Sequence, residues 1–363
     1  MRGRADRQQS MFVAFDLEQR VPEDHPLRPI KVWCDKVLAG MSRDFNRAYG
    51  RNGQVSIPPE SMLKCLLLRA LFGIPSERRL CEACEFNLLY RWFIDWSIER
   101  SMWTPEAFSV NRERFERHEF VRKFFDRVVA EGIAEGLIRD DRFSVDGTLI
   151  RSLAGHKSVK PIDDDSDDDD LNSWGEFKGK KRSNTTHGSV VDPESRLATR
   201  GGEAHPSHSM HVLAESESGL CLSVAVDVAD GGAERRCAIE MLDRVERRHG
   251  IKPKIIAADA GYGTGDFLCG AEGRGITPHA AMPRKPIKGD TERHQARRRM
   301  RRRHRTKSYR VSQRVRRLIE PVIGWYKDVG GLRRTRFLGR KRIQDDAMLV
   351  ASAWNLLRMT ALR

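Results

Sequence analysis

Three acidic residues, Asp146, Asp259 and Glu320, are the candidates for chemistry in this chain of 363 residues. Asp146 lies in a run where apolar and polar residues alternate, and Asp259 directly follows four apolar residues. Glu320 lies where apolar residues recur every three or four positions, as they do along a helix. Carboxylates bind hard divalent cations such as Mg²⁺. A single aspartate in such a place is more often a turn or cap residue, so a metal site requires that the fold bring all three together.

The segment around Glu320 also carries two basic residues. Arg316, Glu320 and Lys327 are separated by four and seven residues, so a helix aligns them along one stripe. Considered alone, such a stripe indicates a row of ion pairs on a solvated helix, which contributes about a few tenths of a kcal/mol. A role of these residues in binding a ligand needs support from other parts of the sequence.

Two patterns indicate the elements that must position these residues. To about residue 138 the apolar residues follow a helical period, and Thr104 followed by Pro105 is typical of an N-cap with proline in the first helical turn. From Arg142 an alternating pattern predicts a strand. The remaining predicted elements are a hairpin (211–214 and 222–228), a helix (233–248), a strand (255–258), a helix (267–271), a strand (277–282) and a helix (311–329). This order predicts an α/β fold, a mixed sheet flanked by helices, in which Asp259 ends a strand, where ligand crevices form.

Charge is unevenly distributed along the chain. The net charge is +15, and residues 251–363 hold 28 Lys and Arg against 9 Asp and Glu. A positive field of this kind indicates a polyanionic partner, most simply nucleic acid, although acidic lipid or protein surfaces would also be attracted. The seven cysteines are scattered, and no apolar stretch reaches the roughly 20 residues of a spanning helix. We therefore expect a reduced, cytoplasmic protein with no signal peptide and no membrane segment.

Two segments are strongly biased in composition. Residues 163–170 contain seven Asp in eight positions and predict a polar, solvated insertion at about 155–185, with a metal site or a DNA mimic as the alternatives. Residues 297–305 contain seven Arg in nine positions. We expect these arginines to contact DNA phosphates, and a purely solubilising role is the alternative. They are Arg297, Arg298, Arg299, Arg301, Arg302, Arg303 and Arg305.

Two further clusters are expected to be structural. Cys81 and Cys84 lack a second pair at zinc-finger spacing and indicate core packing. His205, His208 and His211 are three residues apart, as ligands on a helix would be, but they precede a strand pattern. We do not expect these three histidines to bind a metal together.

Motif blocks occur in a fixed order along the chain. They are Val145-Asp146-Gly147-Thr148, Asp192-Pro193-Glu194, Ala258-Asp259-Ala260-Gly261-Tyr262 and Arg316-x3-Glu320-x6-Lys327 with Gly324-Trp325 inside it, followed by Gly331-Leu332-Arg333 and Asn355-Leu356. One Asp-Gly-Thr block is weak evidence, but the ordered set is specific. Through it, nearly the whole chain resembles the DDE transposases of bacterial insertion sequences, in particular the group called insertion sequence family five.

The resemblance implies a ribonuclease-H-like catalytic domain at residues 139–363, preceded by an all-α domain at residues 1–138 that helps to bind transposon ends. It implies that Asp146, Asp259 and Glu320 hold two Mg²⁺ ions, or Mn²⁺ in their place, about 4 Å apart. Asp146 would bridge both ions. The reaction would be cleavage at the ends of an insertion sequence, followed by joining of the freed 3′-hydroxyls to target DNA.

The implied partners are DNA and further copies of the chain. Arg316 and Lys327, on the stripe of Glu320, would hold phosphates of the transposon end. Terminal inverted repeats and target DNA would be the bound sequences. A homodimer or higher oligomer would assemble on them in the bacterial cytoplasm, at the nucleoid.

The sequence departs from the family pattern at three positions. Gln313 stands where a tyrosine usually precedes the motif arginine, with Tyr309 one turn earlier, and Ala260 stands where a lysine is common. Pro321 directly follows Glu320, and a proline inside a helix costs roughly 3 kcal/mol. Two alternatives therefore stay open: a catalytically inactive DNA-binding protein derived from a transposase, and a structure-specific nuclease of the same fold.

Overall fold

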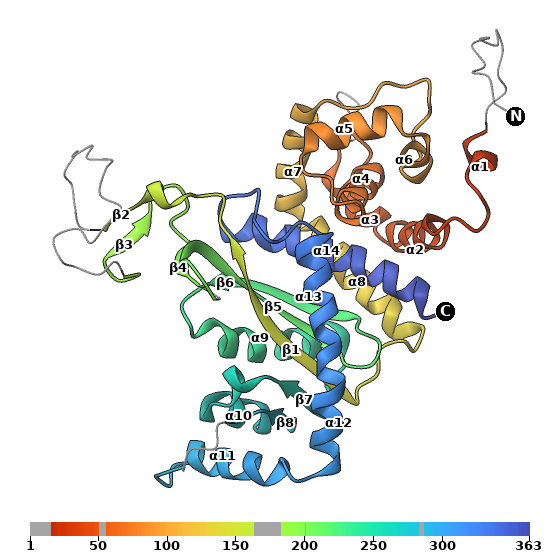
Figure 1. Cartoon of the computed structure of the whole chain (residues 1–363). Helices are drawn as coiled ribbons and strands as arrows, with labels where there is room; N and C mark the ends of the chain where they lie inside the picture. The colour runs from red at the N-terminus through yellow and green to blue at the C-terminus, as the bar shows by residue number, and fades with distance from the viewer. Residues whose placement is uncertain (1–15, 51–55, 163–182, 200, 283–286) are drawn as a thin grey trace, which may run out of the picture.

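The computed structural model describes residues 16–50, 56–162, 183–199, 201–282 and 287–363, in which an all-helical part precedes a mixed sheet (Figure 1). The helices of the first part are α1 (Leu17–Arg20), α2 (Leu27–Gly40), α3 (Ser42–Ala48), α4 (Pro59–Leu71), α5 (Glu77–Phe86), α6 (Leu88–Phe93), α7 (Pro105–His118) and α8 (Phe120–Ala134). The predicted cap at Thr104 is confirmed, because its side chain accepts a hydrogen bond from the amide of Ala107 at the start of α7. Cys81 and Cys84 are buried in this part, as expected.

The sheet combines antiparallel and parallel strands. Its main strands are β1 (Arg142–Arg151), β5 (His205–Glu215), β6 (Cys221–Val228), β7 (Ile255–Ala258) and β8 (Thr277–Ala280), and the short β4 (Arg196–Ala198) pairs with the start of β5. β5 runs antiparallel to both β1 and β6, whereas β1, β7 and β8 are parallel. The order β6-β5-β1-β7-β8 is that of a ribonuclease-H-like fold, as the sequence predicts.

Helices cover both faces of the sheet. α9 (Ala233–His249) follows the hairpin, and α10 (Gly265–Glu272) connects β7 to β8. α11 (Glu292–Arg303), α12 (Lys307–Val315) and α13 (Ile319–Asp328) follow β8, and α14 (Arg340–Ala361) ends the chain. Along β1, a methyl group on Gly147 would approach Glu234 of α9, whereas the next residue, Thr148, contacts Lys327 of α13. Because successive side chains of a strand point to opposite faces, α9 and α13 lie on opposite sides of the sheet.

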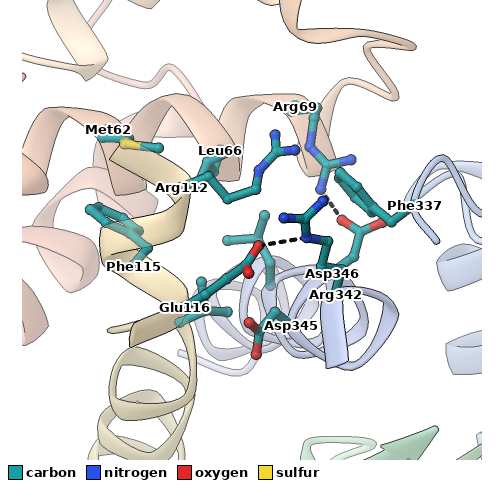
Figure 2. A pocket seen from close by; sticks show the side chains of 12 residues that line it. Met62, Leu66, Arg69, Arg112, Phe115, Glu116, Phe337, Arg342, Asp345 and Asp346 are labelled. Carbon is teal, nitrogen blue, oxygen red and sulfur yellow. Dashed lines mark hydrogen bonds and ion pairs between the residues drawn. The ribbon is translucent and has the colours of Figure 1, made fainter. Parts of the chain in front are cut away.

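The last helix joins the two parts of the molecule. α14 packs against β6 on one side and against α4 and α8 on the other, so it lies between the sheet and the N-terminal helices in Figure 1. At this junction Arg69 of α4 pairs with Asp346 of α14, both about 5 % exposed (Figure 2). Arg342 Nε also lies 3.1 Å from Glu116 Oε1 of α7. The buried apolar residues of both parts form one continuous core.

The predicted helix over 311–329 is wrong in one respect, because it is interrupted. α12 ends at Val315, a 3₁₀ turn covers Arg316–Leu318, and α13 begins at Ile319. Pro321 is consequently the third residue of α13. The 3₁₀ turn carries the helical path on into α13, and the amide of Ile319 donates to the carbonyls of Arg316 and Arg317. The interruption lies where Pro321, which has no amide, cannot donate to the carbonyl four residues earlier.

The Asp-rich segment 163–170 lies outside the described residues. Its described flanks pair as a small ribbon of β2 (Val159–Pro161) and β3 (His187–Ser189). No helix in the described ranges is long and apolar enough to cross a bilayer.

Candidate active site

Asp146 and Asp259 belong to neighbouring parallel strands. The register pairs Ser144 of β1 with Ala257 of β7, and two further residues along both chains lead to Asp146 and Asp259. Adjacent strands lie about 4.8 Å apart, so the two aspartates are neighbours at the carboxyl end of β7. Each carboxylate accepts a hydrogen bond of 2.8 Å from a main-chain amide one or two residues further along the chain.

Helices α12 and α13 lie along β1 on the face that carries Asp146. Near the start of β1, Arg142 Nε donates to Ser312 Oγ at 2.9 Å. Further along, Lys327 Nζ donates to Thr148 Oγ1 at 3.3 Å. Because side chains alternate along a strand, Arg142, Asp146 and Thr148 share one face. The helical segment therefore follows β1 in the same direction, over the candidate site.

Glu320 and Asp146 lie at similar heights along these two elements. Glu320 is two helical turns before Lys327, about 10 Å along α13, and Asp146 is two residues before Thr148, about 7 Å along β1. The Glu320 side chain is exposed. Within the described ranges, Asp146, Asp259 and Glu320 do not form a group whose ligand oxygens all lie within 4.8 Å of one another. Their convergence on a metal pair stays a prediction.

A fourth carboxylate, Glu234, lies beside this pair of strands on the side of the sheet that α9 covers, and was not among the predicted site residues. It occupies the first turn of α9. A methyl group on Gly261 would lie 2.7 Å from Glu234 Oε2 and 3.1 Å from Asp259 Oδ1, so these two oxygens lie close together. A methyl group on Gly147 would lie 3.6 Å from Glu234 Cγ. The only local signal in the sequence is an acidic residue in the first turn of a helix, which usually serves the helix dipole.

The buried ring of Tyr262 lies among the same acids. Tyr262 is 0 % exposed, and in the described part of the chain its hydroxyl has no hydrogen-bond partner. Burial raises the pKa of Tyr262 well above its usual value, and the charges of Glu234, Asp146 and Asp259 raise it further. Several carboxylates thus gather around an uncharged phenol. This set of hard oxygen donors fits Mg²⁺ or Mn²⁺.

Gln313, at the position of the usual motif tyrosine, holds α12 against the sheet. Its Nε2 donates to the carbonyl oxygen of His279 at 2.8 Å and to that of Ala258 at 3.4 Å. Ala258 is the last residue of β7 and directly precedes Asp259. Tyr309, one turn before Gln313, instead stacks on the ring of His304. Gln313 therefore fixes the start of the helical segment at the carboxyl ends of β7 and β8.

The arginine run forms most of α11 and packs partly on α10. Arg299 Nη2 and Arg303 Nη1 lie 2.5 and 2.8 Å from the carboxylate of Glu272, at the end of α10. Arg302 and Arg305 are exposed. The run therefore divides into arginines that hold α11 to α10 and arginines that face solvent. Contact of the run with DNA phosphates stays a prediction.

Comparison with known families identifies the chain. Residues 140–356 match the family described as "Transposase DDE domain", and residues 15–114 match "Transposase domain (DUF772)". The first match covers more than half of the chain, and the chain therefore belongs to the DDE transposase family. It is a DDE-type DNA transposase.

Solved structures and curated proteins add little to this identification. The chain is 10% identical to the Mos1 transposase paired-end complex with left transposon end, with a TM-score of 0.22 over 83% of this chain and 98% of that one. It is 11% identical to the Mos1 Strand Transfer Complex, with a TM-score of 0.21 over 87% of this chain and 99% of that one. No curated protein matches the sequence.

Proposed function

We propose that this transposase cleaves DNA at the ends of an insertion sequence and joins the freed 3′-hydroxyls to target DNA by two-metal phosphodiester transfer. We also propose that it belongs to the group called insertion sequence family five, on the ordered motif blocks. The observation that carries the reaction is the register that makes Asp146 and Asp259 neighbours. The helix of Glu320 follows the same face of β1.

The acidic residues take distinct parts in this proposal. When bound, two Mg²⁺ ions, or Mn²⁺, supply a nucleophile at neutral pH and stabilise the leaving oxygen. Asp146, on β1, would hold the ions together with Asp259 and Glu320. Glu234 Oε2, close to Asp259 Oδ1, is a further oxygen donor. Gln313 keeps the strand of Asp259 and the segment that leads to Glu320 in register.

Basic residues hold the DNA in this proposal. Lys327 contacts Thr148 on the face of β1 that carries Asp146, so its ammonium group is placed to meet a phosphate near the metals. Arg316 lies at the 3₁₀ turn that precedes α13. The helical part at residues 1–138 recognises the terminal repeats, and a homodimer or higher oligomer brings two ends together.

The proposed activity can be tested by nicking of DNA that carries the element's own ends, compared with unrelated duplex, in the presence and absence of Mg²⁺. Asp146→Asn and Asp259→Asn should each abolish nicking and leave end binding intact. The matched control is Asp141→Asn, one residue before β1, where the exposed carboxylate pairs with Lys254. Full nicking by Asp146→Asn, or equal loss in Asp141→Asn, would contradict the assignment.

The alternative is a catalytically inactive DNA-binding protein derived from a transposase. In that case the unmodified chain would bind the transposon ends without nicking them. Pro321 was the sequence feature that favoured this alternative. In the structure a 3₁₀ turn directly before α13 accommodates Pro321, and Glu320 keeps its place in the first turn of α13.

A further inference from the structure

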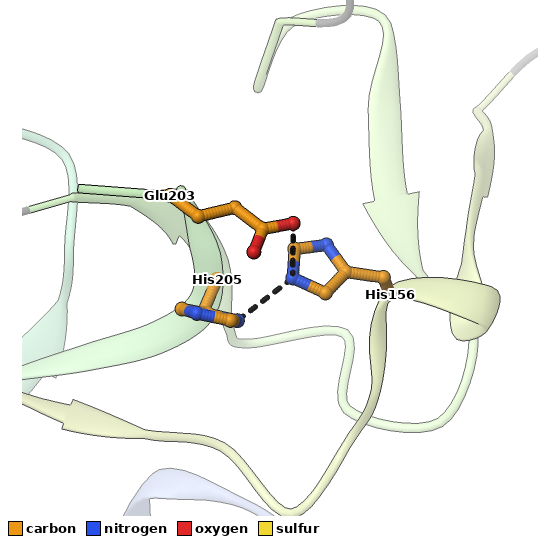
Figure 3. Close-up of side chains that lie close together, drawn as sticks. All are labelled: His156, Glu203 and His205. Carbon is orange, nitrogen blue, oxygen red and sulfur yellow. Dashed lines mark hydrogen bonds and ion pairs between the residues drawn. The ribbon is translucent and has the colours of Figure 1, made fainter. Parts of the chain in front are cut away.

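We propose that His156, Glu203 and His205 form a second metal site, separate from the catalytic carboxylates, that takes a divalent transition metal such as Zn²⁺. Each residue offers one ligand atom, and these atoms all lie within 4.8 Å of one another (Figure 3). His156 Nε2 lies 2.7 Å from His205 Nδ1 and 3.8 Å from Glu203 Oε1.

The geometry requires little movement to accept an ion. Zinc binds imidazole nitrogen at about 2.0–2.1 Å and carboxylate oxygen at about 2.0–2.2 Å. Two ligands of one tetrahedral ion are then separated by about 3.3 Å, between the 2.7 and 3.8 Å found here. The two rings are tilted by 54° to each other, with their centroids 4.7 Å apart. A small rotation of either ring would open the position for the ion.

The ligand types select a different metal from that of the catalytic site. Two imidazoles and one carboxylate suit Zn²⁺ and neighbouring transition ions, whereas Mg²⁺ prefers oxygen ligands alone. Three protein ligands leave a fourth position for water or a further donor. The site also lies apart from Asp146, since β1 continues for five residues, about 17 Å, from Asp146 to its end at Arg151, before His156 is reached.

The position of the cluster indicates a structural role. His156 lies in the turn Gly155–Ser158 after β1, and His205 is the first residue of β5. The chain between them forms β2, β3 and β4, and 49 positions separate the two histidines. An ion held by both histidines would link the two ends of the segment that connects β1 to β5. Closing a loop of this length restricts the unfolded chain, so binding should also stabilise the fold.

The sequence spacing alone points to a different set of histidines. His208 is buried and lies 2.8 Å from Asp192, and His211 is buried under Gly147. Side chains at odd separations on a strand point to opposite faces. The partner of His205 is therefore His156, distant in sequence, and the set with a spacing of three does not form.

The test is titration of Zn²⁺ into the metal-stripped full chain with Mg²⁺ in excess, so that the carboxylate site is already supplied. We expect one Zn²⁺ per chain by isothermal titration calorimetry. Co²⁺ in its place should give the visible absorption of a four-coordinate ion with nitrogen ligands. Zn²⁺ should also slow proteolysis between β1 and β5.

Variants separate this site from the catalytic one. His156→Ala and His205→Ala should weaken Zn²⁺ binding by about tenfold or more, because each removes one of three ligands. Glu203→Gln, at a 72% exposed side chain, should do the same. His187→Ala, in β3, is the control and should bind as the unmodified chain does. Absence of stoichiometric binding in the unmodified chain, equal binding in the three ligand variants, or loss of binding in Asp146→Asn would each overturn the proposal.

Discussion

At the scale of single residues, two glycines near the site leave room for neighbouring side chains. Gly261 has Glu234 Oε2 and Asp259 Oδ1 where a methyl group would stand, at 2.7 and 3.1 Å. Gly147 has the buried ring of His211 there, at 2.7 Å. The atoms that crowd Gly261 are the ends of side chains, whereas the ring beside Gly147 is fixed in the core. The first glycine therefore serves the site, and the second serves the packing of β1 on β5.

Gly261→Ala should impair catalysis and leave the fold intact. The added methyl group displaces the Glu234 carboxylate, and misplacement of a catalytic group by about 1 Å can cost up to about a hundredfold in rate. We expect nicking to fall by about tenfold or more, with a change in the free energy of unfolding below about 1 kcal/mol. Gly324→Ala is the control, because nothing lies within 4 Å of a methyl group there. Equal nicking by the two variants would show that Glu234 has no part in the reaction.

Glu234→Gln tests the same carboxylate without added bulk. Loss of one negative oxygen should weaken metal binding, so the Mg²⁺ concentration for half-maximal nicking should rise by about tenfold. Glu240→Gln is the matched control, on an exposed position of the same helix. An unchanged Mg²⁺ requirement in Glu234→Gln would mean that Glu234 only interacts favourably with the helix dipole of α9 and does not bind the metal.

At the scale of elements, the parts of the site that local patterns encode could be predicted and the parts that depend on tertiary contacts could not. The alternation around Asp146 and the apolar run before Asp259 are sufficient to predict β1 and β7. The apolar spacing does not reveal the 3₁₀ turn at Arg316–Leu318, which leaves that spacing nearly unchanged, although Pro321 is a local signal of a break. Glu234 could not be predicted, because its role depends on glycines that are distant in sequence.

Pro321→Ala tests the interruption of the helix. The 3₁₀ turn before α13 already accommodates the missing amide of Pro321, so alanine should change the free energy of unfolding by less than about 1 kcal/mol. A proline in the middle of a continuous helix costs about 3 kcal/mol, and its replacement would be strongly stabilising. Denaturant unfolding of both proteins distinguishes the two cases. A gain of about 3 kcal/mol would mean that the helix runs unbroken through residue 321.

The junction between α14 and the N-terminal helices predicts a dependence on pH. Burial, together with the charge of Glu116, raises the pKa of Asp345 to about 6. The folded protein therefore holds this proton more tightly than the unfolded chain, and stability falls as pH rises from about 4 to about 6. Asp345→Asn should stabilise the protein at pH 7.5 by about 1–2 kcal/mol, with the difference vanishing towards pH 4.

The neighbouring residue supplies the contrast for this prediction. Asp346 is paired with Arg69 in the buried junction, so Asp346→Asn should lower the free energy of unfolding at pH 7.5 by about 3–5 kcal/mol. Urea unfolding at several pH values measures both effects. A stabilisation by Asp345→Asn that is the same at pH 4.5 and 7.5 would show that the carboxyl is not the source.

At the scale of the whole molecule, the helical part and the sheet share one core through α14 and form one body. The positive charge is concentrated in residues 251–363. Such a field attracts DNA of any sequence. The boundary predicted at about residue 138 falls between α8 and β1, where the all-helical part of the chain gives way to the sheet. Tests of DNA binding therefore require the full chain.

The arginines in and just after α11 allow attraction to DNA to be tested separately from the packing of α11 on α10. Arg302 and Arg305 are exposed, whereas Arg299 and Arg303 hold Glu272. Each phosphate contact adds about 0.9 to the slope of log affinity against log salt. Arg302→Gln with Arg305→Gln should lower that slope by up to about 1.8, equally for terminal-repeat and random DNA, because phosphate contacts read no bases. Arg299→Gln with Arg303→Gln should mainly lower the free energy of unfolding. A slope unchanged by the first pair would mean that these arginines do not contact DNA.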